Sequence, residues 1–366
     1  MWQTDLPSGG IGGLAVAQGL VIAGSRNATD RFDIFVALDA ETGVKRWQVT
    51  YLAEGKLDYG NSPRATPLIA GDHVFLFGAF GDLRCVSFET GRLIWERRLG
   101  KEYESPRLEW GLTVTPLLID GLLIAQPGGS RGCLVALDAE TGEEVWKTTP
   151  GKPGHGAFIP ADIGGRRQLI GHDAKSLGGW DVKTGERLWT VVPPVAGDFQ
   201  VPTPIFIQDD GHGPRLFVTT ENNGSRLYGF RANGTINAEP LGTFSRLAPN
   251  THSPVQLGDR IYGIHNGLHC LKLDEGLSPA WRFRDRAFVK YGSLLGMRSS
   301  KRLLATMLDC QLILLEDQGD SAKELDRLIL RDDGTEMLSH PALVDLHFYL
   351  RLGRSIACLK FARPTD

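Results

Sequence analysis

The chain has 366 residues, with 40 Lys or Arg and 43 Asp or Glu, so its formal net charge is −3. The two signs are mixed along the chain, which argues against the clustered basic face of a nucleic-acid-binding protein. No apolar run reaches membrane-spanning length, and long amphipathic helical patterns are missing. The 45 Gly and 20 Pro instead fit a chain with many turns.

A phrase that ends in tryptophan recurs from the N-terminal part of the chain onward. Residues 37–43 (ALDAETG) lead to Trp47 and return almost letter for letter at 136–142 before Trp146. Looser copies precede Trp95 and Trp189, and in all four copies the Trp lies four residues after the Gly. Such a long internal period is typical of stacked supersecondary units.

Proline gives a second, independent measure of the period. From Pro67 to Pro341 is 274 residues over six periods, or about 46 each, which divides 366 residues into about eight units. Pro cannot donate to a β-ladder, so this position fits the innermost strand of a blade, which has one unpaired edge. The prolines that precede a short apolar run are Pro67, Pro116, Pro160, Pro204, Pro254 and Pro341.

Each unit is expected to contain four short strands. In the second unit these are Arg64–Ile69, His73–Gly78, Leu83–Phe88 and Arg92–Arg98, separated by glycine-containing turns. We therefore predict an all-β fold, an eight-bladed β-propeller of four-stranded antiparallel blades, as a single domain over residues 1–366. The expected blades are 11–51, 62–98, 110–150, 155–193, 201–245, 252–287, 292–330, and 340–361 plus 1–6.

The two ends of the chain are expected to share one blade. The C-terminal segment supplies three strands and no outer strand, whereas Trp2-Gln3-Thr4 resembles the outer strand at Trp47. We predict that the N-terminal strand completes the last blade and removes an open sheet edge. The stretch 320–328 has the most helical pattern in the chain, and we interpret it as a strand with an excursion.

The repeated tryptophans are interpreted as docking residues between blades. Each ring is expected on an outer strand against the neighbouring blade, where its indole N–H needs a partner. The alternative is an ordinary core Trp in a hairpin. The docking candidates are Trp2, Trp47, Trp95, Trp146, Trp189 and Trp281.

The five cysteines are expected to be separate, buried and small apolar packing residues. They are Cys85, Cys133, Cys270, Cys310 and Cys358, and they form no Cys-x-x-Cys or adjacent pair. The usual zinc, redox and haem-attachment spacings are therefore excluded.

The phrase Ala-x-Asp-x-x-Thr-Gly-x-x-x-Trp resembles the tryptophan-docking motif of the pyrroloquinoline-quinone-type (PQQ-like repeat) propellers. It matches well in four units and, with an altered turn, at Trp281. The resemblance implies one of two branches: dehydrogenases that hold the quinone and Ca²⁺ on the propeller axis, or outer-membrane assembly lipoproteins and related envelope proteins without quinone. Residues 59–67 (YGNSPRATP) are similar to a signature of other bacterial members, for which it implies no established chemistry.

The chain departs from the dehydrogenase branch in several respects. It has no adjacent cysteines, its units stay near 46 residues without long insertions, and the Ca²⁺ ligands of that branch do not map onto it. No catalytic residue and no metal ligand is therefore carried over. No cofactor is predicted, and PQQ with Ca²⁺ remains the cofactor of the alternative.

A ligand site, if present, is expected at the axis mouth, where loops enter the innermost strands. A pocket there could bind a planar or anionic ligand through Trp110, Arg64 and Lys290, with His155 or His252 as a base. The alternative is that these side chains plug the channel. The candidates are Asn61, Arg64, Trp110, His155, Gln200, His252, Lys290, Tyr291 and His340.

Two functions compete. The first is a non-enzymatic binding or scaffold propeller that presents its ring face or axis pocket to a protein or small ligand. The alternative is a PQQ-dependent oxidoreductase acting on alcohols or sugars; no serine nucleophile motif supports hydrolysis. By resemblance we expect the periplasm or cell envelope. The chain starts at the closing strand rather than a signal peptide, so the cytoplasm stays open, and we expect a monomer.

Overall fold

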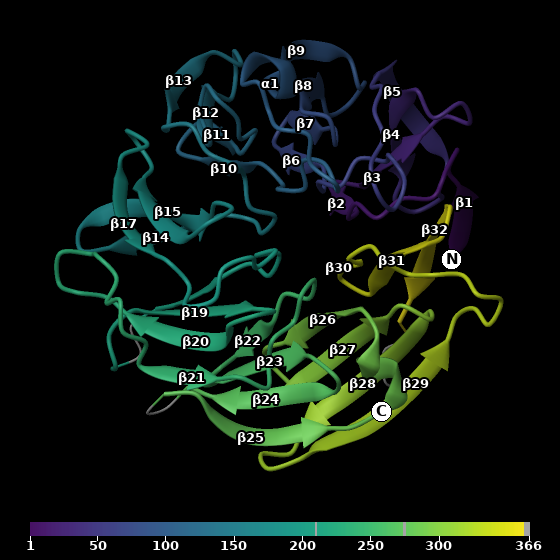
Figure 1. Ribbon diagram of the computed structural model, residues 1–366. Helices are drawn as coiled ribbons and strands as arrows, with labels where there is room; N and C mark the ends of the chain where they lie inside the picture. The colour runs from purple at the N-terminus through teal and green to yellow at the C-terminus, as the bar shows by residue number, and fades with distance from the viewer. Residues whose placement is uncertain (209–210, 274–275, 362–366) are drawn as a thin grey trace. The chain divides into compact units, whose positions relative to one another are not determined.

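The computed structural model describes residues 1–208, 211–273 and 276–361 (Figure 1). In these ranges 32 strands form eight four-stranded antiparallel sheets. Seven sheets pair consecutive strands and the eighth also pairs the first strand with the last, so the fold is an eight-bladed β-propeller, as predicted. Residues 209–210 and 274–275, inside the expected fifth and sixth blades, and 362–366, at the end of the expected domain, lie outside the described residues.

The chain divides into two compact units, and each is described by itself. Unit 1 comprises Met1–Lys152 with Glu336–Asp366. Its strands are β1 (Trp2–Asp5), β2 (Ala15–Ala17), β3 (Leu20–Arg26), β4 (Phe32–Asp39), β5 (Lys45–Leu52), β6 (Leu68–Ala70), β7 (His73–Phe77), β8 (Asp82–Ser87), β9 (Leu93–Arg98), β10 (Leu117–Ile119), β11 (Leu122–Ala125), β12 (Val135–Asp138), β13 (Glu144–Lys147), β30 (Ala342–Val344), β31 (His347–Leu352) and β32 (Ser355–Lys360).

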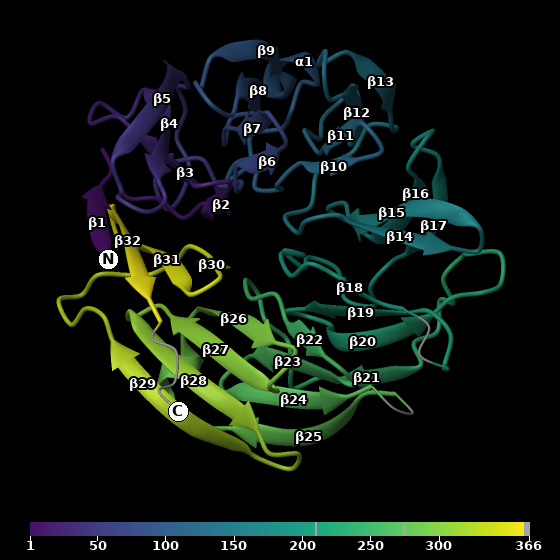
Figure 2. The same ribbon diagram turned by 180° about the vertical axis from the view of Figure 1, so that it is seen from behind.

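Unit 2 comprises Pro153–Thr335 and contains the other four sheets (Figure 2). Its strands are β14 (Ile159–Ile163), β15 (Arg166–His172), β16 (Leu177–Asp181), β17 (Arg187–Val191), β18 (Ile205–Ile207), β19 (Arg215–Thr220), β20 (Gly224–Gly229), β21 (Gly242–Phe244), β22 (Val255–Leu257), β23 (Arg260–Ile264), β24 (Leu268–Lys272), β25 (Ser278–Phe283), β26 (Gly292–Met297), β27 (Arg302–Met307), β28 (Gln311–Asp317) and β29 (Ala322–Ile329).

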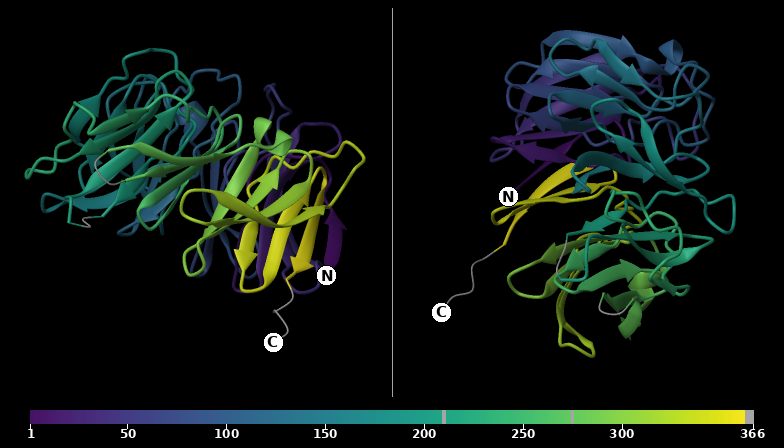
Figure 3. Two further views of the ribbon diagram at one scale, coloured as in Figure 1. Left: turned by 90° about the horizontal axis from the view of Figure 1, so that it is seen from below. Right: turned by 90° about the vertical axis from the view of Figure 1, so that its left-hand side faces the viewer.

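The N-terminal strand completes the last blade, as the sequence predicts. Strand β1 pairs antiparallel with β32, from Trp2 opposite Cys358 to Asp5 opposite Ser355. The sheet order is β1-β32-β31-β30, and Figure 3 shows the purple N-terminal strand beside the yellow C-terminal ones. The stretch with the most helical pattern is strand β29, and the described helices are one turn each, α1 (Leu99–Glu102) and η1 (Arg286–Val289).

The innermost strand of the second blade starts later than predicted, at Leu68 instead of Arg64. The residues before Leu68 make hydrogen bonds to groups outside this sheet. Arg64 holds loop carbonyls, and the backbone N–H of Thr66 donates to the Thr115 hydroxyl of the next blade at 3.1 Å. These bonds draw the backbone away from the ladder with β7.

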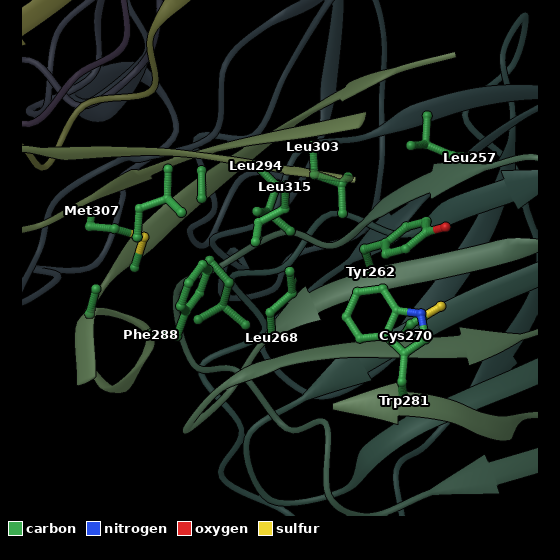
Figure 4. Packing of buried hydrophobic residues seen from close by; sticks show 14 residues of the cluster. Leu257, Tyr262, Leu268, Cys270, Trp281, Phe288, Leu294, Leu303, Met307 and Leu315 are labelled. Carbon is green, nitrogen blue, oxygen red and sulfur yellow. The ribbon is translucent and has the colours of Figure 1, made fainter. Parts of the chain in front are cut away.

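Within each unit, neighbouring blades pack their apolar faces together. In unit 2, Tyr262, Cys270 and Trp281 of one blade form a cluster with Leu303 and Leu315 of the following one (Figure 4). All five cysteines are buried and unpaired by disulfides, as expected for small packing residues. A blade that lies between two neighbours can bury the apolar side chains of both of its faces.

Three docking tryptophans of unit 1, Trp2, Trp47 and Trp95, bind the same repeated position. The indole N–H groups of Trp2, Trp47 and Trp95 donate to the carbonyl oxygens of Ala40, Phe88 and Ala139 at 2.9, 2.8 and 3.0 Å. Each acceptor lies at the start of the turn in the following blade.

The motif glycine of the same turn lies under the tryptophan ring. A Cβ built on Gly43, Gly91 or Gly142 would come within 2.5, 2.8 or 2.7 Å of that ring. The glycine is therefore required for close packing as well as for its positive φ.

In unit 2 the docking tryptophans use side-chain acceptors. The indole N–H of Trp189 donates to the Gln168 side chain at 2.7 Å, and Gln168 in turn donates to the carbonyl of Gly234 in the next blade. The indole N–H of Trp281 donates to the Asp317 carboxylate at 2.9 Å.

Candidate functional site

Arg64 is buried in unit 1, and main-chain oxygens surround its guanidinium. Nε donates to the carbonyl of Trp110 at 3.0 Å, and the two terminal nitrogens donate to the carbonyls of Ser62, Asp58 and Gly60 at 2.6–2.7 Å. The Ser62 hydroxyl at 3.5 Å is the fifth acceptor. Burial, and then repulsion from Arg26, lower the pKa of Arg64 to about 10, so the side chain stays charged at neutral pH.

The other unit 1 candidates lie around this arginine and in the loop before β30. Asn61 is buried; its side-chain oxygen accepts from the backbone N–H of Leu57 at 2.7 Å, and its amide donates to Asp30. Trp110 is half-buried, and its carbonyl links it to Arg64. His340 is exposed and follows Ser339, whose hydroxyl donates to the Gly10 carbonyl at 3.4 Å.

Two unit 2 candidates are brought together by their backbones. The N–H of Gly156, next to His155, donates to the carbonyl of Gln200 at 2.9 Å. Burial lowers the pKa of the half-buried His155, which favours the neutral imidazole. The buried Gln200 has a φ of 52°. It lines a cavity of about 10 Å³ with His172, Asp198 and Arg226, which is the volume of about one water molecule.

The remaining unit 2 candidates form a second neighbourhood. His252 is buried, and its Nδ1 lies 3.1 Å from the carbonyl oxygen of Gly292, so the histidine contacts the segment of Lys290 and Tyr291. Lys290 is exposed and lies 3.9 Å from Asp309. Tyr291 is 40% exposed. The residue contacts described here join candidates within a unit, and the convergence of all nine at one site remains a prediction.

Sequence reasoning missed a buried charge cluster in unit 1. Arg26 lies opposite Asp33 in the β3–β4 register, and their side chains form an ion pair at 2.6 Å. Burial raises the pKa of the Asp33 carboxyl to about 7, although Arg26 lowers it. Arg351 is also buried, and its guanidinium donates to the Gly24 carbonyl at 2.7 Å. A charge within an otherwise apolar strand, as in residues 20–26, is the signal that could have pointed to the pair.

A second feature that sequence reasoning missed is a cavity of about 510 Å³ in unit 1, for which the sequence gives no signal. Three loop segments line it, around Leu57, Phe80 and Leu108. We call it the unit 1 cavity. Its lining residues are Gly55, Lys56, Leu57, Ala79, Phe80, Gly100, Ser105, Pro106, Arg107, Leu108, Gly111 and Leu112. This volume is in the range of ligand pockets, about 300–1,000 Å³.

Within the described residues, no group of three or more His, Cys, Asp or Glu side chains is arranged to hold a metal ion. Nor does any helix in the described ranges have the length and apolar character needed to cross a membrane.

The chain was also compared with known proteins. The family profile PQQ_2, described as outer membrane protein assembly factor BamB, matches residues 1–125 and 104–290. The outer membrane protein assembly factor BamB of Yersinia pestis is 27% identical over 149 residues, 40% of this chain and 35% of that protein. The quinohemoprotein alcohol dehydrogenase ADH-IIG of Pseudomonas putida is 26% identical over 144 residues, 37% of this chain and 20% of that protein.

These matches cover only part of the relatives, about a third of the Yersinia protein and a fifth of the Pseudomonas enzyme. The crystal structure of BamB from Moraxella catarrhalis aligns over 100% of this chain and 98% of that chain, with a TM-score of 0.65 and 16% identity. At that identity the likeness shows the fold alone. The profile matches together span residues 1–290 of 366, and the chain therefore belongs to the PQQ-type propeller family described as outer membrane protein assembly factor BamB.

Proposed function

We propose that this chain is a non-enzymatic scaffold of the cell envelope that presents loop surfaces of its propeller to a protein partner. Family membership and the likeness to BamB proteins, which are named outer membrane protein assembly factors, support the scaffold role and the location in the cell envelope. We further propose that the chain forms a single domain and acts as a monomer.

The hydrogen bonding of the Arg64 guanidinium is the observation that carries this proposal. All three nitrogens of its guanidinium donate to acceptors within unit 1, and four of the five acceptors are main-chain carbonyls. An arginine in this state fixes the surrounding loops and has no donor left for an anionic ligand. It supports the plug interpretation of the candidate residues and a rigid loop surface.

A photo-crosslinking amino acid tests the scaffold proposal directly. It is placed at Tyr59, in the loop between the first two blades and 64% exposed, and at Val145, on the outer strand β13 and 52% exposed. We expect envelope proteins to crosslink specifically at the loop position and not at the strand position. Equal labelling at both positions, or none at either, would contradict a loop-directed scaffold.

The alternative is a quinone-dependent oxidoreductase, favoured by the likeness to the Pseudomonas enzyme. The unit 1 candidates do not fit an anionic quinone, because Arg64 has no free donor and Asn61 is bonded to Leu57 and Asp30. Titration with PQQ and Ca²⁺, followed by tryptophan quenching and by dye reduction with alcohols or sugars, separates the two functions: tight binding with turnover would overturn the scaffold.

A further inference from the structure

The walls of the unit 1 cavity are mostly apolar and well fixed. Leu57, Leu108 and Leu112 line it with the Phe80 ring. A Cβ on Gly55 would lie 2.0 Å from the Phe80 ring, so this glycine allows the 55–57 loop to approach the aromatic wall. The buried guanidinium of Arg26 also lies over this ring, with its Cζ 5.7 Å from the ring centre.

The charged lining residues of this cavity, Lys56 and Arg107, are both cations and both exposed. Among the residues described, neither has a hydrogen-bond or ion-pair partner for its side chain. The cavity therefore combines an apolar interior with a positively charged, unneutralised rim.

Several carboxylates in the same loops are already paired elsewhere. Glu54 pairs with Arg31 at 2.6 Å, Glu102 with Arg97 at 2.6 Å, and Glu104 with Arg131 at 2.8 Å. Glu109 is exposed and lies outside the lining. The positive rim is thus complementary to an external anion.

The lining offers binding rather than chemistry. Its hydroxyl, that of Ser105, donates to the Pro127 carbonyl at 2.8 Å, and the lining contains no carboxyl, thiol or imidazole group. The side chains of Lys56 and Arg107 lie at the rim of the cavity. A site for a small anion would instead bury its cations around that anion.

We propose that the unit 1 cavity docks an apolar side chain of a partner polypeptide that carries carboxylates on the neighbouring residues. This inference rests on the scaffold function proposed above. The apolar anchor is buried against Phe80 and the leucines, where an aromatic side chain can bury about 150–250 Å² of its surface. The flanking carboxylates meet Lys56 and Arg107, which set the orientation and the choice of partner.

Fluorescence anisotropy with labelled heptapeptides tests the proposal on the full chain. The probe has phenylalanine between two aspartates, and two comparison peptides have lysines in place of the aspartates or alanine in place of the phenylalanine. We expect the acidic phenylalanine peptide to bind at least tenfold more tightly than either comparison peptide. Unlabelled 3-phenylpropionate serves as a small-molecule competitor and should displace the probe only at concentrations at least tenfold above those of the unlabelled peptide.

The variant that tests the rim is Lys56→Glu combined with Arg107→Glu. Both side chains are exposed and unpaired, so the fold should not change, and we expect binding of the acidic peptide to weaken at least tenfold. The matched control is Arg92→Glu, an exposed arginine in the β8–β9 turn outside the lining, which should change binding less than twofold. A second variant, Leu108→Ala, should weaken the phenylalanine peptide and leave the alanine peptide unchanged.

No binding of the acidic peptide at 1 mM, or equal binding of the three peptides, would overturn the inference. Competition by 3-phenylpropionate as strong as that of the peptide would overturn the choice of a polypeptide partner. Either result leaves the scaffold function to be judged by crosslinking at Tyr59, which does not line the cavity.

Discussion

The indole ring of Trp95 lies against Gly142 of the following blade, so closely that a Cβ on the glycine would come within 2.7 Å of the ring. The same turn supplies the acceptor for the Trp95 indole N–H, the carbonyl of Ala139 at 3.0 Å. The repeated phrase of one blade and the tryptophan of the previous one thus form a single contact. This relationship explains why the two recur together along the chain.

Gly142→Ala should therefore destabilise the protein more than Gly121→Ala. The φ angles are 75° and 78°, so the left-handed backbone costs the same in both variants, about 1–2 kcal/mol. Only Gly142 has a ring above it, because nothing lies within 4 Å of a Cβ on Gly121. We expect an additional loss of about 1–3 kcal/mol for Gly142→Ala in urea unfolding, from overpacking. Equal losses in the two variants would contradict this role of the ring.

Arg64→Lys should lower stability although the charge is kept. A lysine presents three donors from one atom and cannot reach the carbonyls of Ser62, Gly60 and Trp110 together. We expect a loss of at least about 2 kcal/mol, because buried carbonyls lose their donors. Arg107→Lys, at an exposed and unpaired arginine, is the control and should change the unfolding midpoint little. A stable Arg64→Lys variant would mean that the guanidinium contacts do not hold the loops.

The Asp33 carboxyl should make stability depend on pH near neutrality. Burial raises its pKa from 3.8 to about 7 in the folded protein, against the pull of Arg26. Its contribution is fully present below pH 3.8 and is lost as the pH rises through 7. Asp33→Asn keeps an oxygen acceptor for Arg26, and its stability should not fall as the pH rises through 7. Urea midpoints of the variant and the parent between pH 5 and 8 measure the difference; parallel curves would exclude a raised pKa.

His269 should make stability depend on pH in the opposite direction to Asp33. Burial lowers its pKa from 6.5 to about 4, although the His265 carbonyl, 3.0 Å from Nε2, favours the charged form. Its contribution is present above pH 6.5 and is lost as the pH falls toward 4. His269→Gln keeps an amide donor for that carbonyl, and we expect its stability to fall less than that of the parent between pH 6.5 and 4.5. An unchanged slope would argue against a buried neutral imidazole.

The fold was predictable because its signals are local and repeated. The Gly–Trp spacing and the prolines predicted eight blades, and the likeness of Trp2 to Trp47 predicted the pairing of β1 with β32. The candidate site was predicted less completely, because its contacts are made by loops that have no repeat.

The loop contacts join residues whose sequence positions give no sign of proximity. The Arg351 guanidinium lies within 2.6 Å of where a Cβ on Gly10 would stand, although the two residues are at opposite ends of the chain. The acceptors of Arg64 are carbonyl oxygens, which every residue possesses, so no side-chain pattern marks them. The unit 1 cavity likewise depends on the conformations of three separate loops.

The pairing of β1 with β32 also constrains how the protein is made. Strand β1 is synthesised well before its hydrogen-bonding partner, because Trp2 pairs with Cys358. Until β32 is made, the N–H groups of β1 can donate to any other extended chain and its C=O groups can accept from it, so nascent molecules on one messenger are candidates for strand exchange. Chaperone binding to β1 would protect its unpaired backbone groups until β32 has been made.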